Sequence, residues 1–124
     1  MMTLNHSTIY IRRLRLYAFH GVAEQEQRVG AQFEVSLRVH YNIKRAAESD
    51  NLADTLSYAS LCETIRKQMA QPSRLLEHVA GRIAQAIFEE FTGVRAIDVE
   101  ITKLNPPMGA DCDGAGIEAH FTNE

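Results

Sequence analysis

The sequence contains no tryptophan, only three prolines and only two cysteines among its 124 residues. Cys62 and Cys112 stand alone in the sequence, so they supply neither a disulfide framework nor a spaced metal-binding pattern. No apolar run approaches the roughly 20 residues that a membrane-spanning helix needs. We therefore expect neither a disulfide-stabilised secreted domain nor a membrane protein.

Positive charge is also scarce. Lysine and arginine number 13 against 16 aspartates and glutamates, which gives a formal net charge of -3. A domain that binds nucleic acid normally carries a basic patch, and this balance offers none. The first residues, MMTLNHST, contain neither the basic nor the apolar segment of a secretory signal. We expect a cytoplasmic protein with no nucleic-acid partner and no membrane partner.

The chain does have the composition of an ordinary globular domain. Apolar residues make up 45% and charged residues 23% of the sequence, which is typical of a folded protein with one core. A length of 124 residues is the usual size of a single domain. Since no repeat or linker divides the chain, we expect one domain over residues 1–124.

Alternating apolar and polar residues predict four strands. Residues 33–43 place apolar side chains at odd positions and polar side chains at even positions, which indicates a strand with one dry and one wet face. Residues 8–17 also alternate, but the parity changes at Arg12 and Arg13, as a β-bulge would cause. Two further strands are predicted over residues 95–103 and 115–121. We interpret the polar segment between the first two strands as a long loop.

Two helices are predicted between the second and third strands. Ser57 is a suitable N-cap for a first helix, in which apolar residues recur every four positions. A second helix is predicted from Ser73 with a broad apolar face, and Gly93 would end it. The order β-β-α-α-β-β predicts an α+β fold, with one four-stranded antiparallel sheet and both helices on its dry face.

The wet face of the predicted sheet is dense in charge. Its charged and histidine residues are Glu34, Arg38, His40, Asp98, Glu100, Glu118 and His120. A solvated sheet face is one interpretation. The other is that this face lines a wide polar channel in an oligomer.

Lys103 occupies an unexpected position at the end of the third predicted strand. It shares the parity of the apolar residues Ile97, Val99 and Ile101, so it points to the face that the strand buries. One interpretation is a lysine that extends past the strand end to reach water. The other is a partly buried lysine at a pocket, usable as an acid or base. The next residues include Pro106–Pro107, which end the strand and stiffen the backbone.

Four other side chains are candidates, each with an ordinary alternative. Glu77 begins the second helix, where a carboxylate is favoured by the helix dipole, but it could also clamp an amidine-like edge with two hydrogen bonds. Glu24 and Glu26 lie in the predicted loop, where glutamates are usually solvated. Tyr58 opens the first helix and could pack, stack on a flat ligand or transfer a proton. The five histidines show no metal-ligand spacing, so we expect no metal site.

Four motifs follow one another in fitting order across nearly the whole chain. They are LYAFHGVAEQEQRVGAQFEV, ESDNLADTLSYASL, LLEHVAGRIA and ITKLNPP followed by DGAGIE. Together they resemble dihydroneopterin aldolase, the aldolase family of folate biosynthesis. The resemblance implies the tunnelling fold, in which subunits join edge to edge into tetramer rings and two rings stack, typically as a homo-octamer. It also implies active sites between neighbouring subunits.

The resemblance assigns a role to every candidate residue except Glu24. Lys103 in ITKLNPP matches the catalytic acid/base of the family. Glu77 in LLEH matches the residue that holds the 2-amino and N3 edge of the pterin, with the backbone of Leu76 contributing. Glu26 matches the active-site glutamate of the first loop, and Tyr58 matches an aromatic residue supplied by the adjacent subunit. The loop 108–114 departs from the family pattern, in which an aromatic residue often precedes Asp-Gly.

The implied reaction is a retro-aldol cleavage of 7,8-dihydroneopterin into 6-hydroxymethyl-7,8-dihydropterin and glycolaldehyde. The family needs no metal and no cofactor for it, because the dihydropterin carries its own electron sink. Two alternatives remain open at this stage. One is an epimerase that acts on dihydroneopterin or its triphosphate with the same residues. The other is a non-catalytic α+β pterin-binding module, which would keep Glu77 but have no need of Lys103.

Overall fold

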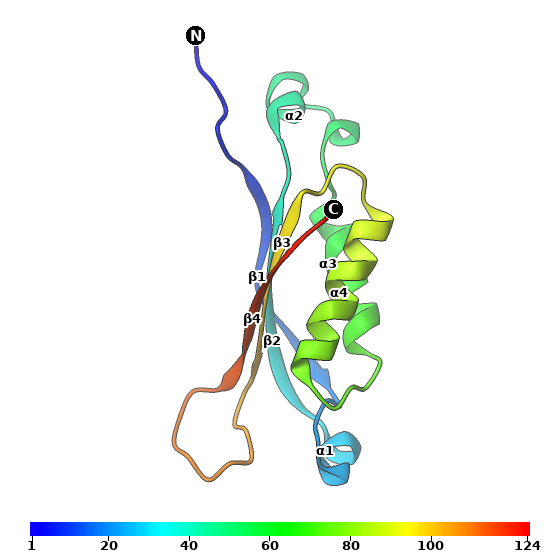
Figure 1. Cartoon of the computed structure of the whole chain (residues 1–124), viewed down its shortest axis with the longest axis vertical. Coiled ribbons are helices and arrows are strands. Elements are labelled where there is room, and N and C mark those ends of the chain that lie inside the picture. Colours follow the sequence, from blue (N-terminus) through cyan, green and yellow to red (C-terminus); the bar gives the residue numbers. More distant parts are fainter.

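A computed structural model describes all 124 residues of the chain. Four strands form one antiparallel sheet in the order β1-β2-β3-β4, and two long helices pack side by side against one face of it (Figure 1). The strands are β1 (Thr8–Ala18), β2 (Ala31–His40), β3 (Ala96–Lys103) and β4 (Ala115–Thr122). The helices are α3 (Tyr58–Met69) and α4 (Leu76–Glu90). The predicted α+β architecture is confirmed.

The core lies between the sheet and the two helices. Strands β2 and β3 contribute their apolar face, and α3 and α4 contribute the side chains that cover it. The fully buried core residues include Phe33, Val35, Leu37, Val39, Ile97, Val99, Ile101, Leu61, Ile65, Val79, Ile83 and Ile87. Their removal from water is the main force that holds the helices on the sheet.

The predicted bulge in β1 is present. The pairing of β1 with β2 shifts between Ile11, which faces Leu37, and Leu14, which faces Val35. Arg13 adopts a positive φ of 54°, and its backbone N–H donates to the Ser36 hydroxyl at 2.9 Å. Because the bulge inserts extra residues, Ile11 and Leu14 both pack against the core.

Several predicted boundaries differ from the observed ones. The strand predicted over residues 33–43 spans Ala31–His40. The helix predicted from Ser73 begins at Leu76, because the backbone N–H of Ser73 donates to the His20 ring and its carbonyl accepts from Gly21. The predicted cap at Ser57 is confirmed, since its hydroxyl accepts from the Ser60 N–H at 3.3 Å.

Three short helices interrupt segments that were not predicted as helical. They are α1 (Glu24–Val29), α2 (Lys44–Ser49) and η1 (Leu52–Asp54). None of them contains a buried residue, so no apolar periodicity marks them in the sequence. Helix α1 lies in the segment that was predicted as a loop, at the end of the sheet where the β3–β4 loop also lies (Figure 1).

None of the helices is long and apolar enough to cross a membrane.

Candidate active site

The end of β3 that carries Lys103 borders a pocket of about 210 Å³. The turn after β1, the start of α4 and the two ends of the β3–β4 connection form its walls. The lining residues are His20, Gly21, Arg74, Leu76, Glu77, Lys103, Pro106, Ala115, Gly116 and Ile117. The fold therefore brings into one cavity residues from the turn after the first strand and residues of the last strand.

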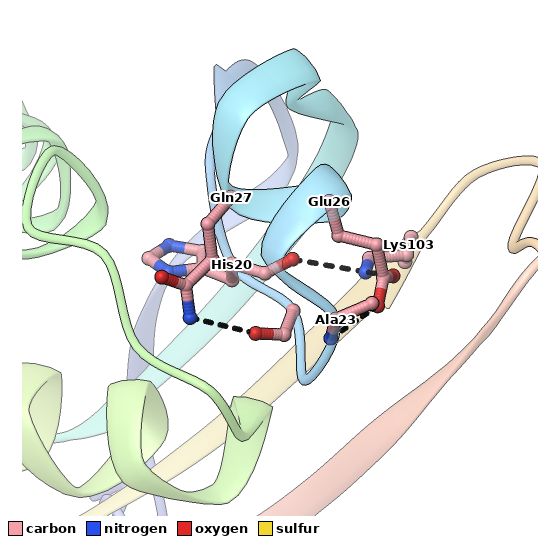
Figure 2. Close-up of polar contacts among 6 residues, drawn as sticks. His20, Ala23, Glu26, Gln27 and Lys103 are labelled. Atoms are coloured by element: carbon pink, nitrogen blue, oxygen red, sulfur yellow. Dashed lines mark hydrogen bonds and ion pairs between the residues drawn. The ribbon is translucent and has the colours of Figure 1, made fainter.

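Lys103 lies in the wall of this pocket rather than extending into open water. Its ammonium donates to the carboxylate of Glu26 at 2.6 Å and to the backbone carbonyl of His20 at 2.9 Å (Figure 2). Only 12% of its side chain is exposed. Hydrogen bonds to these two oxygens replace most of the hydrogen bonds to water that the ammonium loses on burial.

Glu26 holds Lys103 from the first turn of α1. One of its carboxylate oxygens accepts from the lysine, and the other accepts from the backbone N–H of Ala23 at 3.2 Å (Figure 2). The hydrogen bond from Lys103 lowers the pKa of Glu26, although burial opposes this effect. Glu26 is therefore ionised at neutral pH and presents a carboxylate to the Lys103 ammonium. Glu24, in contrast, pairs with Arg28 on the open surface.

Gly21 makes room for this arrangement. A Cβ atom at this position would lie 2.4 Å from the Cβ of Glu26, well inside the normal contact distance. The Gly21 carbonyl also accepts from the side chain of Gln27 at 2.8 Å, which fastens α1 to the turn. The glycine thus allows the carboxylate to reach Lys103.

Glu77 and Leu76 begin α4 and face the same pocket. The Glu77 side chain makes no hydrogen bond or ion pair within the chain, so both carboxylate oxygens are available to a ligand. Its place in the first helical turn puts its negative charge near the positive end of the helix dipole. The pocket thus combines an unpaired carboxylate on one wall with a lysine on another.

Comparison with known proteins decides the family. The sequence profile of dihydroneopterin aldolase matches residues 9–120, which is most of the chain. This chain belongs to the dihydroneopterin aldolase family. The resemblance inferred from the four motifs is confirmed, and with it the expectation of a carbon–carbon lyase of folate biosynthesis.

Individual members of the dihydroneopterin aldolase family resemble the chain over almost its full length. Dihydroneopterin aldolase of Staphylococcus epidermidis is 35% identical over 117 residues, which cover 94% of this chain and 97% of that protein. The structure of E. coli dihydroneopterin aldolase in complex with neopterin superposes with a TM-score of 0.85 at 23% identity, over 93% and 98% of the two chains. A dihydroneopterin aldolase from Burkholderia thailandensis bound to guanine gives a TM-score of 0.77 at 18% identity, over 96% and 93%. These two structures share the fold of this chain.

His20 is a residue of this aldolase that the sequence interpretation missed as part of the site. It is 1% exposed, and its Nδ1 accepts from the backbone N–H of Ser73 at 3.0 Å. Burial, and to a smaller extent the positive charges of Arg82 and Lys103, lower its pKa from 6.5 to about 4. His20 is therefore neutral. The sequence offered only the dipeptide His-Gly after a strand, and no pattern in it indicates that the His20 backbone carbonyl accepts from a lysine.

Arg74 is the second residue of the aldolase pocket that was not predicted. It precedes α4, is exposed, and lines the pocket together with Glu77. No sequence pattern marked it, because the link between α3 and α4 has no periodicity that fixes the direction of its side chains.

Tyr58 lies away from the pocket of its own chain. It is 71% exposed and begins α3, whereas the pocket lies beyond the far end of that helix. The 12 residues of α3 span about 18 Å. Of the five predicted site residues, the fold of one aldolase chain brings together Lys103, Glu26, Leu76 and Glu77 but does not add Tyr58.

Proposed function

We propose that this chain cleaves 7,8-dihydroneopterin into 6-hydroxymethyl-7,8-dihydropterin and glycolaldehyde, with Lys103 as the central acid/base and Glu77 as the pterin anchor. The observation that carries the proposal is the position of the Lys103 ammonium. It is held by Glu26 and the His20 carbonyl at the wall of a pocket that Glu77 also lines. Family membership supplies the substrate class.

Glu77 and Leu76 would bind the pyrimidine ring of the pterin. The 2-amino group and N3–H are adjacent donors on one edge, and a carboxylate accepts such a pair with two parallel hydrogen bonds. Neopterin and guanine, the ligands in the E. coli and Burkholderia structures, share this edge. The carboxylate of Glu77 is free to accept it here.

Lys103 would act on the proton that moves during cleavage. Breaking the C1′–C2′ bond requires loss of the 2′-hydroxyl proton and leaves an electron pair on C1′. The C6=N5 bond of the dihydropterin receives that pair, and a proton then returns to C1′. The Lys103 ammonium, held at 2.6 Å by the Glu26 carboxylate, would stabilise the developing negative charge and donate the returning proton.

Glu26 and Tyr58 would complete the proton path. Glu26 orients Lys103 and compensates its charge, and a tyrosine hydroxyl with ordered water can accept the 2′-hydroxyl proton. Because the substrate carries its own electron sink, this chemistry requires no metal and no cofactor.

We further propose that the working enzyme is a homo-oligomer of tetramer rings that stack into an octamer in the cytoplasm. Tyr58 would then enter the pocket of the neighbouring subunit. Two observations support this arrangement: β1 and β4 leave both sheet edges open, and Tyr58 is exposed far from its own pocket. The charged sheet face would line the central channel.

The direct test is incubation of the purified protein with 7,8-dihydroneopterin and an assay for glycolaldehyde. We expect stoichiometric release of glycolaldehyde and 6-hydroxymethyl-7,8-dihydropterin. A parallel reaction with 7,8-dihydromonapterin measures epimerisation at C2′, which uses the same cleavage followed by re-addition. Interconversion of the two pterins without glycolaldehyde would assign the chain to epimerisation instead.

A further inference from the structure

A histidine–aspartate–histidine group lies on the sheet face that the helices leave open. The Nε2 atom of His40 lies 2.6 Å from one carboxylate oxygen of Asp98, and the Nδ1 atom of His120 lies 2.6 Å from the other. The three candidate ligand atoms lie within 4.8 Å of one another. The linear sequence separates these residues by up to 80 positions, so no ligand motif could reveal the group.

The register of the sheet assembles it. His40 is at the end of β2, Asp98 is in β3, and His120 is in β4, and the three strands are hydrogen-bonded neighbours. Asp98 faces Arg38 on one side and His120 on the other, yet its carboxylate pairs with His40 and His120 and forms no ion pair with Arg38. Side chains that project from paired strands are more rigidly placed than those on loops.

The surroundings leave space and add further donors. The ring of His6 lies 5.2 Å from that of His40, and the rings of His40 and His120 are 5.6 Å apart. A hollow of about 410 Å³ is lined by all three histidines. On the other side of Asp98, a second hollow of about 460 Å³ is lined by Glu100 and Glu118, which face each other across β3 and β4.

The chemistry of these donors suits a divalent transition metal better than calcium or magnesium. Imidazole nitrogens favour zinc, copper, nickel and iron, whereas the hard cations take oxygen ligands. Two neutral imidazoles and one carboxylate carry a net charge of -1, which attracts a dication. Ligands around tetrahedral zinc lie about 3.3 Å apart, given metal–ligand bonds of about 2.0 Å. To reach this spacing, the 2.6 Å contacts with Asp98 would lengthen by about 0.7 Å, and a pair of ligand atoms at the 4.8 Å limit would approach by about 1.5 Å.

We propose that His40, Asp98 and His120 form a binding site for a divalent transition-metal ion, represented by Zn²⁺, with His6 or water as a further ligand. The site is distinct from the pterin pocket. Asp98 and Lys103 lie five residues apart on β3 and point to opposite faces, so a strand rise of about 3.3 Å per residue separates them by roughly 17 Å. The metal would cross-link β2, β3 and β4 rather than take part in carbon–carbon cleavage.

The test uses protein without an affinity tag, stripped with a chelator and dialysed. Zn²⁺ titration by calorimetry should give one ion per chain, and Co²⁺ should give the visible absorption bands of a four- or five-coordinate nitrogen and oxygen site. His40→Ala and His120→Ala should each weaken binding by at least about 10–100-fold, the loss that follows from removing even an outer-shell partner. His78→Ala, which removes a histidine outside the group, should bind as the wild type does.

A second measurement needs no variant. Zn²⁺ should shift the ring resonances of His40 and His120 in NMR spectra of the wild-type chain, while those of His20 and His78 stay unchanged. Stoichiometric binding that survives both alanine substitutions, shifts confined to His6, or no binding above that of the double variant His40→Ala/His120→Ala would each overturn the proposal. Circular dichroism verifies that the variants are folded.

Discussion

Lys103 illustrates how a single residue can contradict the pattern of its strand for a chemical reason. It occupies the parity of the buried residues of β3, where an isolated ammonium would be costly to desolvate. Glu26 and the carbonyl of His20 supply the oxygens that make this position tolerable. Neither partner is visible from the strand itself, since both come from the β1–β2 connection.

We predict that Lys103→Ala retains pterin binding but loses turnover. A positioned proton donor or acceptor contributes roughly 10²–10⁴-fold, so kcat should fall at least within that range. Glu77 and the pocket walls remain, so the affinity for neopterin should change much less. Single-turnover glycolaldehyde release and a neopterin titration measure the two effects. Turnover within a few-fold of the wild type would remove Lys103 from the mechanism.

Glu77→Gln should have the opposite profile. The amide presents one acceptor instead of two, so the adjacent donors of the pterin edge are left poorly paired at a cost of about 1–3 kcal/mol. Neopterin affinity measured by calorimetry should fall accordingly, while the rate of the bound substrate changes little. Asp111 lies outside the pocket lining, so Asp111→Asn serves as the matched charge control. Equal affinities of Glu77→Gln and the wild type would contradict the assigned role.

His20 should make the stability of the chain depend on pH. Its pKa is about 4 in the folded state and 6.5 as a free side chain, so the unfolded chain binds the proton first. The stabilisation is complete above pH 6.5 and is lost as the pH falls from 6.5 toward 4. Each pKa unit corresponds to about 1.4 kcal/mol, so the full loss is on the order of 3 kcal/mol.

Urea unfolding of the wild type and of His20→Asn between pH 7.5 and pH 5 tests this effect. The asparagine oxygen can replace Nδ1 as the acceptor for Ser73, but it does not titrate. The pH dependence above pH 5 should therefore be flatter in the variant. Parallel curves for the two proteins would show that His20 is not the titrating group.

Among the elements, those that bury a face were predictable and those that do not were missed. The strict alternation over residues 33–43 and the four-residue recurrence after Ser57 identified β2 and α3 because each buries apolar side chains. Helix α1 buries none, and it is held by Glu26 contacting Ala23 and by Gln27 contacting Gly21. These contacts depend on where the chain turns, which the local sequence does not determine. The same limit applies to the site. The sequence marked Glu77 and Lys103 as candidates, but nothing in it indicated that His20 and Arg74 would line the same pocket.

Gly21→Ala tests whether the position of α1 matters to the chemistry. The new Cβ would lie 2.4 Å from the Cβ of Glu26, so α1 or the turn must shift and the ion pair with Lys103 must loosen. We expect at least a tenfold lower kcat, because loss of orientation alone is costly. Gly81→Ala is the control, since its Cβ would meet no atom within 4 Å. Unchanged turnover in folded Gly21→Ala protein would mean that Glu26 need not be held tightly.

At the scale of the whole molecule, one chain carries an incomplete proposed site. Lys103 and Glu77 line the pocket, whereas Tyr58 is exposed at the other end of α3. We predict that Tyr58→Phe and Lys103→Ala proteins, each nearly inactive alone, regain activity when they are unfolded together and refolded into mixed oligomers. Some pockets then receive an intact lysine from one subunit and an intact tyrosine from the next.

Mixed oligomers verified by native mass spectrometry must be used for this assay. A control mixture of Lys103→Ala with Glu77→Gln should show no more activity than the two proteins contribute separately. Lys103 and Glu77 belong to the same pocket of the same chain, so mixing cannot create a pocket that has both. No rescue in the first mixture would place the tyrosine outside the shared site.

The sheet has an even number of strands, and this parity has a consequence for assembly. Because each strand is antiparallel to its neighbour, the two edge strands β1 and β4 also run in opposite directions. A second copy that laid its β1 beside the β4 of the first would continue the alternation without a break, and so would every later copy. With an odd number of strands, every such junction would instead be parallel. A single type of junction can thus extend one uniform sheet through many copies, and the twist that each copy adds decides after how many copies the sheet closes on itself.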